Sequence, residues 1–296
     1  MITPELEAMR ALIRETRPAE QPDIATRRAN MDLTPTFFDA PEGVTTEDVT
    51  VAARPARWHR PDGGDARRAT LYLHGGAYVS GSLESHREVC ARLAIATGAP
   101  VLALDYRLAP EHPLPAGLDD AVAAYRWLTS DGGIAPANAA IAGDSAGGGL
   151  TMATLVAVRD TGHALPGAAA VVSPWVDVAC RFPSHTERAH LEPMLRTEFL
   201  LADAAAYVGQ ADLLDPRANP IDADLRGLCP VLVLVGTDEI LYDDGIALHE
   251  RLRAAGVESD LHIGEDMFHV WPGTPVLAES REAMTRIAKF LARLAA

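Results

Sequence analysis

The sequence predicts an α/β protein with a mostly parallel sheet and helices on both faces. From residue 69 onward, short apolar runs alternate with helix-length periodic segments. The runs are nearly continuous in apolar residues, which is typical of strands buried on both faces. The chain has 296 residues, enough for one large domain or for one domain that carries an insertion.

The first part of the chain predicts one helix and two short strands. A helix over 4–15 would begin with Pro4 in its first turn and present one apolar face. That face consists of Leu6, Met9, Leu12 and Ile13. A Pro/Thr-rich connector follows to about residue 45, and strand-like stretches cover 49–53 and 57–60. We therefore treat 1–45 as an N-terminal cap or lid segment.

Residues 46–296 are predicted to form the catalytic domain. Its remaining strands are expected at 69–73, 100–104, 139–142, 168–172 and 231–235, with a shorter one at 260–263. Its helices are expected at 84–97, 118–129, 146–160, 244–254 and 277–294. Residues 178–225 break this rhythm with many Arg, His, Pro and Asp residues. We interpret them as an insertion that packs with the N-terminal helix as a small helical cap.

The charge and composition exclude several kinds of partner and chemistry. A net charge of −15, from 41 acidic and 26 basic residues, disfavours nucleic acids and anionic membranes, which need basic patches. Lys289 is the only lysine, so Schiff-base, pyridoxal phosphate and P-loop chemistry lack a candidate amine.

Cysteine usage and the N-terminus bear on location. Cys90, Cys180 and Cys229 are widely spaced and form no CxxC pair, which argues against a disulfide framework or a zinc cage. The N-terminus lacks the features of a signal peptide, and no apolar run approaches the ~18 residues of a membrane span. A cytoplasmic location without membrane association is expected, and no metal or cofactor is predicted.

A candidate nucleophile lies between a predicted strand and a predicted helix. Residues 143–147 read Gly-Asp-Ser-Ala-Gly and match G-x-S-x-G. In such a turn, Ser145 is lifted into the open, small neighbours avoid clashes, and the helix amides face developing negative charge. Gly-rich strand–helix turns also occur for packing reasons, so this motif needs support from others.

A second glycine motif follows the strand at 69–73. His74-Gly75-Gly76-Ala77 lets backbone amides turn inward to bind an oxyanion. We assign that role to the amides of Gly75 and Gly76, together with that of Ala146. The alternative is a tight glycine turn, and for the His74 side chain we favour a structural hydrogen-bonding role.

The base and the acid are expected at the ends of late strands. His269 follows the strand at 260–263 and a short loop, and Asp238 follows the strand at 231–235. We predict His269 as the base and Asp238 as the carboxylate that orients it, with Glu239 as the neighbouring alternative. The order of serine, acid and histidine is that of the α/β-hydrolase fold, which predicts a serine carboxylesterase with an acyl-enzyme intermediate.

From about residue 68 to the C-terminus, the chain resembles the hormone-sensitive-lipase-like family of α/β-hydrolase esterases. The resemblance rests on five ordered motifs that begin at His74, Asp105, Gly143, Ser173 and Gly236, and on Met267-Phe268-His269. It implies a cap built from the N-terminus and the insertion, a structural Asp144, and no cofactor. Ala77 replaces the usual third glycine, which leaves the shape of the acyl pocket less defined.

The resemblance also implies a small-molecule ester substrate with a short acyl group, such as an acetyl ester or a lactone. Family members are often homodimers. Candidates for substrate contacts are the aromatic residues Tyr78, Trp175, Phe199, Tyr207 and Phe268, although core packing could explain each one. Two rival functions remain: an amidase or N-deacetylase on the same triad, and a small-molecule binder like the family's hormone receptors, which have lost the histidine.

Overall fold

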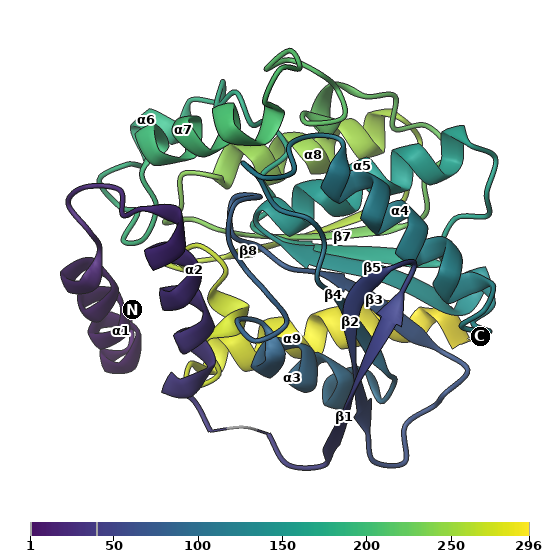
Figure 1. Ribbon diagram of the computed structural model, residues 1–296. Helices are drawn as coiled ribbons and strands as arrows, with labels where there is room; N and C mark the ends of the chain where they lie inside the picture. Colours follow the sequence, from purple (N-terminus) through teal and green to yellow (C-terminus); the bar gives the residue numbers. More distant parts are fainter. Residues whose placement is uncertain (1, 40, 296) are drawn as a thin grey trace.

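The computed structural model describes residues 2–39 and 41–295, which surround one eight-stranded sheet (Figure 1). The strands are β1 (Val44–Val51), β2 (Arg54–Pro61), β3 (Ala69–Leu73), β4 (Val101–Leu104), β5 (Ala139–Asp144), β6 (Ala168–Val172), β7 (Val231–Gly236) and β8 (Ser259–Gly264). Their order in the sheet is β1-β2-β4-β3-β5-β6-β7-β8. β1 and β2 pair antiparallel, as do β2 and β4, and the other pairs are parallel.

Helices cover both faces of the sheet (Figure 1). One face carries α4 (Ala116–Thr129), α5 (Ala146–Asp160) and α8 (Tyr242–Ala254), and the other carries α3 (Arg87–Thr97) and α9 (Ala278–Leu291). Short 3₁₀ turns are η2 (Pro136–Asn138), η4 (Trp271–Gly273) and η5 (Ala292–Ala295). Strands β3 to β7 are buried at every position. The predicted α/β-hydrolase fold is confirmed.

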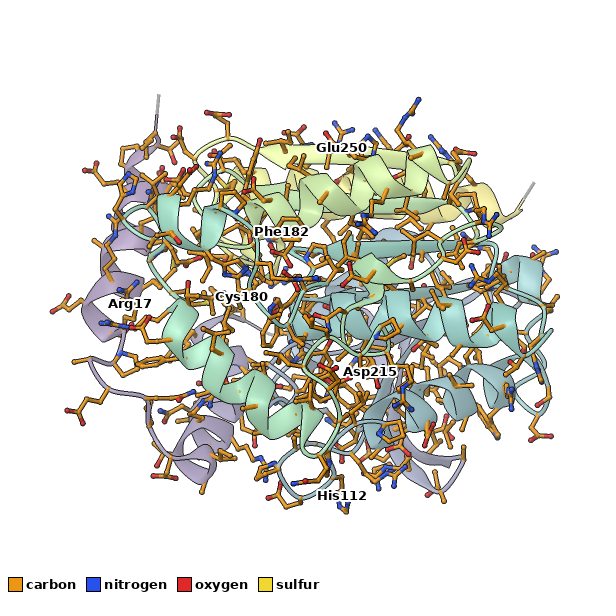
Figure 2. The ribbon with its side chains drawn as sticks, turned by 90° about the horizontal axis from the view of Figure 1, so that it is seen from above. Arg17, His112, Cys180, Phe182, Asp215 and Glu250 are labelled. Atoms are coloured by element: carbon orange, nitrogen blue, oxygen red, sulfur yellow. The ribbon has the colours of Figure 1, made fainter. Side chains whose placement is uncertain are left out.

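Five further elements lie outside this strand–helix alternation. They are α1 (Pro4–Thr16), α2 (Ile24–Leu33) and η1 (Thr34–Phe37) near the N-terminus, and α6 (Ser184–Glu187) and α7 (Thr197–Val208) between β6 and β7. A short turn, η3 (Pro220–Asp222), follows them. The two groups lie side by side in both views (Figures 1 and 2). We call α1, α2, α6, α7 and the loops that join them the cap.

The N-terminal and later parts of the cap are joined by polar contacts. Arg17, at the end of α1, donates to the carbonyl of Glu192 at 2.8 Å, and Figure 2 shows it facing the segment between α6 and α7. Arg27 on α2 forms an ion pair of 2.5 Å with Asp203 on α7. The sequence pattern does not predict α2, which lies in the expected connector. No residue of α2 is buried, so it has no apolar stripe for a pattern to detect.

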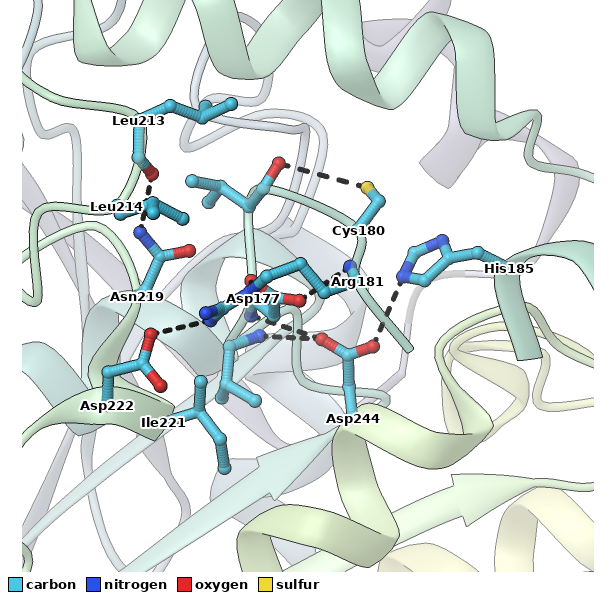
Figure 3. A network of polar contacts seen from close by, with 12 residues as sticks. Asp177, Cys180, Arg181, His185, Leu213, Leu214, Asn219, Ile221, Asp222 and Asp244 are labelled. Atoms are coloured by element: carbon cyan, nitrogen blue, oxygen red, sulfur yellow. Dashed lines mark hydrogen bonds and ion pairs between the residues drawn. The ribbon is translucent and has the colours of Figure 1, made fainter. Parts of the chain in front are cut away.

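The chain between β6 and α6, which leads into the cap, is hydrogen-bonded to α8 (Figure 3). Asp244, in the first turn of α8, accepts the amides of Val176 and Asp177 at 3.2 and 3.1 Å. The same carboxylate lies 3.3 Å from Nε2 of His185 on α6. Asp177 in turn accepts the amide and the guanidinium of Arg181 at 2.7 and 2.8 Å. This network fixes where the chain leaves the sheet.

Candidate active site

Ser145 occupies a strained turn between β5 and α5. Its φ of 54° and ψ of −123° are rare for a residue with a side chain and are typical of functional positions. The turn requires glycine at Gly147, because a Cβ there would lie 2.0 Å from the carbonyl oxygen of Leu73. The motif at 143–147 therefore forms the tight strand-to-helix turn that the sequence predicts.

A short segment at the end of β6, residues 172–175, links the serine to the other candidate residues. Its backbone makes two hydrogen bonds of 2.9 Å with the backbone of Ser145. On its other side, the hydroxyl of Ser173 donates to Glu239 Oε1 at 2.8 Å and accepts the amide of Val270 at 3.0 Å. Ser145, Glu239 and the loop of Val270 are thereby gathered at the carboxyl end of the sheet.

The histidine of this site is paired with Glu239. His269 Nδ1 lies 2.8 Å from Glu239 Oε2. Glu239 is completely buried, and its other oxygen accepts the amide of Gly236 at 2.6 Å as well as the Ser173 hydroxyl. A carboxylate on Nδ1 favours the tautomer whose Nε2 carries the lone pair that accepts a proton.

The prediction that Asp238 orients the histidine is wrong. Asp238 forms an ion pair with Arg10 of α1 and accepts the hydroxyl of Thr237 at 3.1 Å. Neighbouring side chains in the turn after β7 point in different directions, so only one of the two acids can face His269. The structure gives this position to Glu239, the alternative in the sequence analysis.

Several charges act on His269, which is almost completely buried. Burial by itself lowers the pKa of His269, but the hydrogen bond and the charge of Glu239 oppose it. The charges of Glu192 and Asp144 act in the same direction, and the net pKa is raised. The surroundings therefore favour the imidazolium that forms when a histidine accepts a proton.

The prediction for the amide of Gly75 needs correction. This amide donates to Asp144 Oδ1 at 3.2 Å, so its donor is already used. The amides of Gly76, Ala77 and Ala146 have no hydrogen-bond acceptor within residues 2–39 and 41–295. In the loop of residues 74–77, which we call the glycine loop, the amides free to bind an oxyanion are therefore those of Gly76 and Ala77, one residue later than predicted. The amide of Ala146 is free as predicted.

Asp144 holds the glycine loop in place. Besides Gly75, its buried carboxylate accepts the Tyr72 hydroxyl at 2.7 Å and lies 3.3 Å from His86 Nε2. Burial tends to raise the pKa of Asp144, but His86 and Tyr72 outweigh it and the pKa is lowered. His74 stacks on the ring of Tyr106 at 4.3 Å, and burial lowers its pKa to about 3. The side chains of Asp144 and His74 therefore both support the glycine loop.

Comparison with known proteins identifies the family of this chain. A model of the alpha/beta hydrolase fold family matches residues 70–273. An acetyl-hydrolase from Streptomyces hygroscopicus is 44% identical over 98% of this chain and 97% of its own. An ethyl acetate hydrolase from Pseudomonas putida is 37% identical over 73% of this chain and 70% of its own.

Among solved structures, an esterase of the bacterial hormone-sensitive lipase family superposes with a TM-score of 0.96. It is 41% identical in sequence, and the match covers 99% of both chains. The chain belongs to the hormone-sensitive-lipase-like family of α/β-hydrolase esterases. This esterase is a carboxylic-ester hydrolase of the serine type, as the sequence predicts.

Three of the predicted substrate-contacting residues come together in the esterase. Tyr78, next to the glycine loop, stacks on Tyr207 of α7 with ring centroids 3.7 Å apart and planes 4° apart. Tyr78 also lies 5.9 Å from the ring of Trp175. Because the segment of Trp175 is bonded to the backbone of Ser145, this aromatic cluster lies near the serine.

The other two predicted contacts lie elsewhere. Phe199 is half-buried on α7, under the guanidinium of Arg196 at 5.6 Å. Phe268 is fully buried with Met267 and Trp271 in the core on the α3–α9 face, a different core cluster from that of Tyr78, Trp175 and Tyr207. The adjacent side chain, His269, points toward Glu239, and the phenyl ring of Phe268 points the other way, into the core on the α3–α9 face.

Three cap residues that the sequence pattern does not predict contact the turn after β7. They are Arg10, which pairs with Asp238, Arg188, which donates to the carbonyl of Thr237, and Glu192, which accepts the amide of Ile240. No motif marks these positions, because they come from cap segments whose docking is set by tertiary packing.

Within the described part of the chain, no group of three His, Cys, Asp or Glu side chains is arranged to hold a metal ion. Over the same residues, no helix combines the length and apolarity needed to cross a membrane.

Proposed function

We propose that this esterase hydrolyses short-chain acyl esters through a triad of Ser145, His269 and Glu239. The observation that carries the proposal is the hydrogen bond between His269 and Glu239. Residues 172–175, which are bonded to Glu239 through Ser173 and to the backbone of Ser145, link this pair to the strained turn of the serine. His269 takes the proton of Ser145 as the hydroxyl attacks the ester carbonyl, and then gives it to the leaving alcohol. Water hydrolyses the acyl-enzyme along the same route.

The negative charge of each tetrahedral intermediate would be bound by the amides of Gly76, Ala77 and Ala146. Two observations and one general property of helices support this assignment. These amides have no acceptor among the described residues, Ala146 starts α5, and a helix start attracts negative charge. Loss of one such donor costs about 2.7–4 kcal/mol in the activation barrier of measured cases.

The aromatic cluster supports a preference for short acyl groups. Tyr78, Trp175 and Tyr207 are each at most 5% exposed, and their stacking leaves little freedom to move aside for a long chain. The names of the relatives, an acetyl-hydrolase and an ethyl acetate hydrolase, agree with this preference. Acetyl esters and small lactones are therefore the proposed substrate class.

A substrate panel tests the proposal. p-Nitrophenyl esters of two to eight carbons, a small lactone and a matched p-nitroanilide would be compared, with Ser145→Ala as the blank. We expect kcat/KM to be highest for the shortest esters and much lower for the anilide. Ser145→Ala should fold normally and lose about 10⁴- to 10⁶-fold in kcat, as in other serine hydrolases.

Near-wild-type turnover by folded Ser145→Ala would overturn the triad. A rate that rises steadily toward eight carbons would instead leave the triad in place and reject the short-acyl preference. Faster cleavage of the anilide than of the matched ester would favour the amidase alternative.

A further inference from the structure

Glu192 is a buried carboxylate that the proposed mechanism does not use. It lies in the cap between α6 and α7 and is 2% exposed. Oε1 accepts the amides of Met194 and Leu195 at 2.7 and 3.1 Å. Oε2 reaches out of the cap and accepts the amide of Ile240 at 3.1 Å. One carboxylate therefore joins a cap loop to the residue that directly follows Glu239.

Burial of this carboxylate has a cost that its partners only partly offset. Removing a carboxylate from water is unfavourable unless donors or positive charges replace the water. Burial raises the pKa of Glu192, and the strongest influence in the opposite direction is the charge of His269. The influence is reciprocal, because Glu192 is among the groups that raise the pKa of His269.

Other charged groups surround this pair from several elements. Arg17 from the end of α1 donates to the backbone carbonyl of Glu192 at 2.8 Å. Arg10 of α1 pairs with Asp238, and Arg188 from the cap donates to the carbonyl of Thr237. From the sheet, Glu239 faces His269 directly, and Asp144 at the end of β5 adds a further negative charge. The nearby arginines contact backbone carbonyls or Asp238, so the carboxylate of Glu192 has no direct ion pair among the residues that the structure describes.

We propose that Glu192 is a positioning residue of the esterase, which fixes the peptide after Glu239 and stabilises the imidazolium of His269 through its charge. The inference rests on the proposed function, because it needs His269 as the base. Two consequences follow from its place in the cap. The hydrogen bond from Glu192 in the cap to the amide of Ile240 keeps Glu239 in position to face His269. His269 therefore has its full proton affinity only while the cap is docked.

A purely structural role for Glu192 would have a different signature. If the carboxylate only braced the cap loop, its neutral isostere would lower stability or kcat without changing the proton affinity of His269. The pH dependence of kcat/KM separates the two cases, since its acidic limb reports the protonation of the essential base in the free enzyme.

The test compares pH profiles of kcat/KM for p-nitrophenyl acetate, followed at the isosbestic wavelength of p-nitrophenol. The wild type is compared with Glu192→Gln and with Glu187→Gln, a matched change at an exposed carboxylate on α6. We expect the acidic limb of Glu192→Gln to move to lower pH, on the order of one pH unit. The Glu187→Gln profile should overlay that of the wild type. An unmoved limb in folded Glu192→Gln would overturn the proposal.

Glu192→Asp is the second variant, which keeps the charge and shortens the reach. Its acidic limb should stay near that of the wild type while kcat falls several-fold, because one short carboxylate cannot reach both the cap loop and Ile240. A limb that moves in the Asp variant, or an unchanged kcat, would contradict the proposal. Wild-type turnover by Ser145→Ala would instead reject the proposed function itself, whatever the Glu192 profiles show.

Discussion

The two halves of the site are held in place by different kinds of contact. On the nucleophile side, between β3 and β5, backbone packs so closely on backbone that only glycine, which has no side chain, fits at the contact points. A Cβ at Gly143 would lie 2.4 Å from the carbonyl oxygen of Gly147, and one at Gly147 would lie 2.0 Å from that of Leu73. Steric exclusion at these glycines, together with the hydrogen bonds of Asp144, defines this half.

On the acid–base side, between β7 and β8, side-chain hydrogen bonds set the geometry. Glu239 is held by Gly236, Ser173 and His269, and the cap adds its own contacts to the same turn. The difference has a practical consequence. Substitutions of the closely packed glycines on the nucleophile side should disrupt the structure, whereas substitutions of Glu239 or His269 should mainly change proton affinity and rate.

The largest effect is expected on the nucleophile side. In Gly147→Ala, the new Cβ would lie 2.0 Å from the Leu73 carbonyl oxygen and 2.5 Å from that of His74, so the turn must shift. We expect a loss of about 3 kcal/mol in the free energy of unfolding, measured by urea denaturation, and almost complete loss of esterase activity.

Gly273→Ala is the matched control, because its Cβ would meet only Val89 at an ordinary contact of 3.5 Å. Its free energy of unfolding should change by less than about 1 kcal/mol. Equal stability of the two variants would show that backbone packing does not define the nucleophile side.

A smaller effect is expected where the cap meets the acid–base side. Arg10→Met removes the partner of the largely buried Asp238 and leaves its charge uncompensated. The free energy of unfolding should fall by about 1–3 kcal/mol, while kcat/KM falls less than about tenfold because Glu239 stays in place. The double variant Arg10→Met/Asp238→Asn should recover much of this stability. If the double variant were no more stable than the single one, the uncompensated charge would not be the cause.

The same contrast explains what the sequence could predict. The continuous apolar runs predicted the central strands of the sheet, since a strand buried on both faces has few alternatives to apolar residues. The turn at 143–147 was equally predictable, because only glycine fits at its two ends, Gly143 and Gly147. His269 was identified from its place after the last strand, and the structure pairs it with an acid.

The acid and the glycine-loop amides were harder to assign. Asp238 and Glu239 are adjacent carboxylates in one turn, and only three-dimensional packing decides which one faces His269. The use of the Gly75 amide by Asp144 depends on a contact between residues 69 positions apart. The cap residues that brace the turn come from segments without sequence motifs. Tertiary contacts, rather than local pattern, decide all three.

The pairing of His269 with Glu239 is the central claim, and paired isosteric substitutions test it most directly. Glu239→Gln and Asp238→Asn each remove one negative charge from the same turn with little change in shape. We expect kcat/KM of Glu239→Gln to fall by about 10⁴-fold, as when the orienting acid of a serine protease is amidated. We expect Asp238→Asn to stay within about tenfold of the wild type. The reverse order, measured on folded enzymes with p-nitrophenyl acetate, would contradict this pairing.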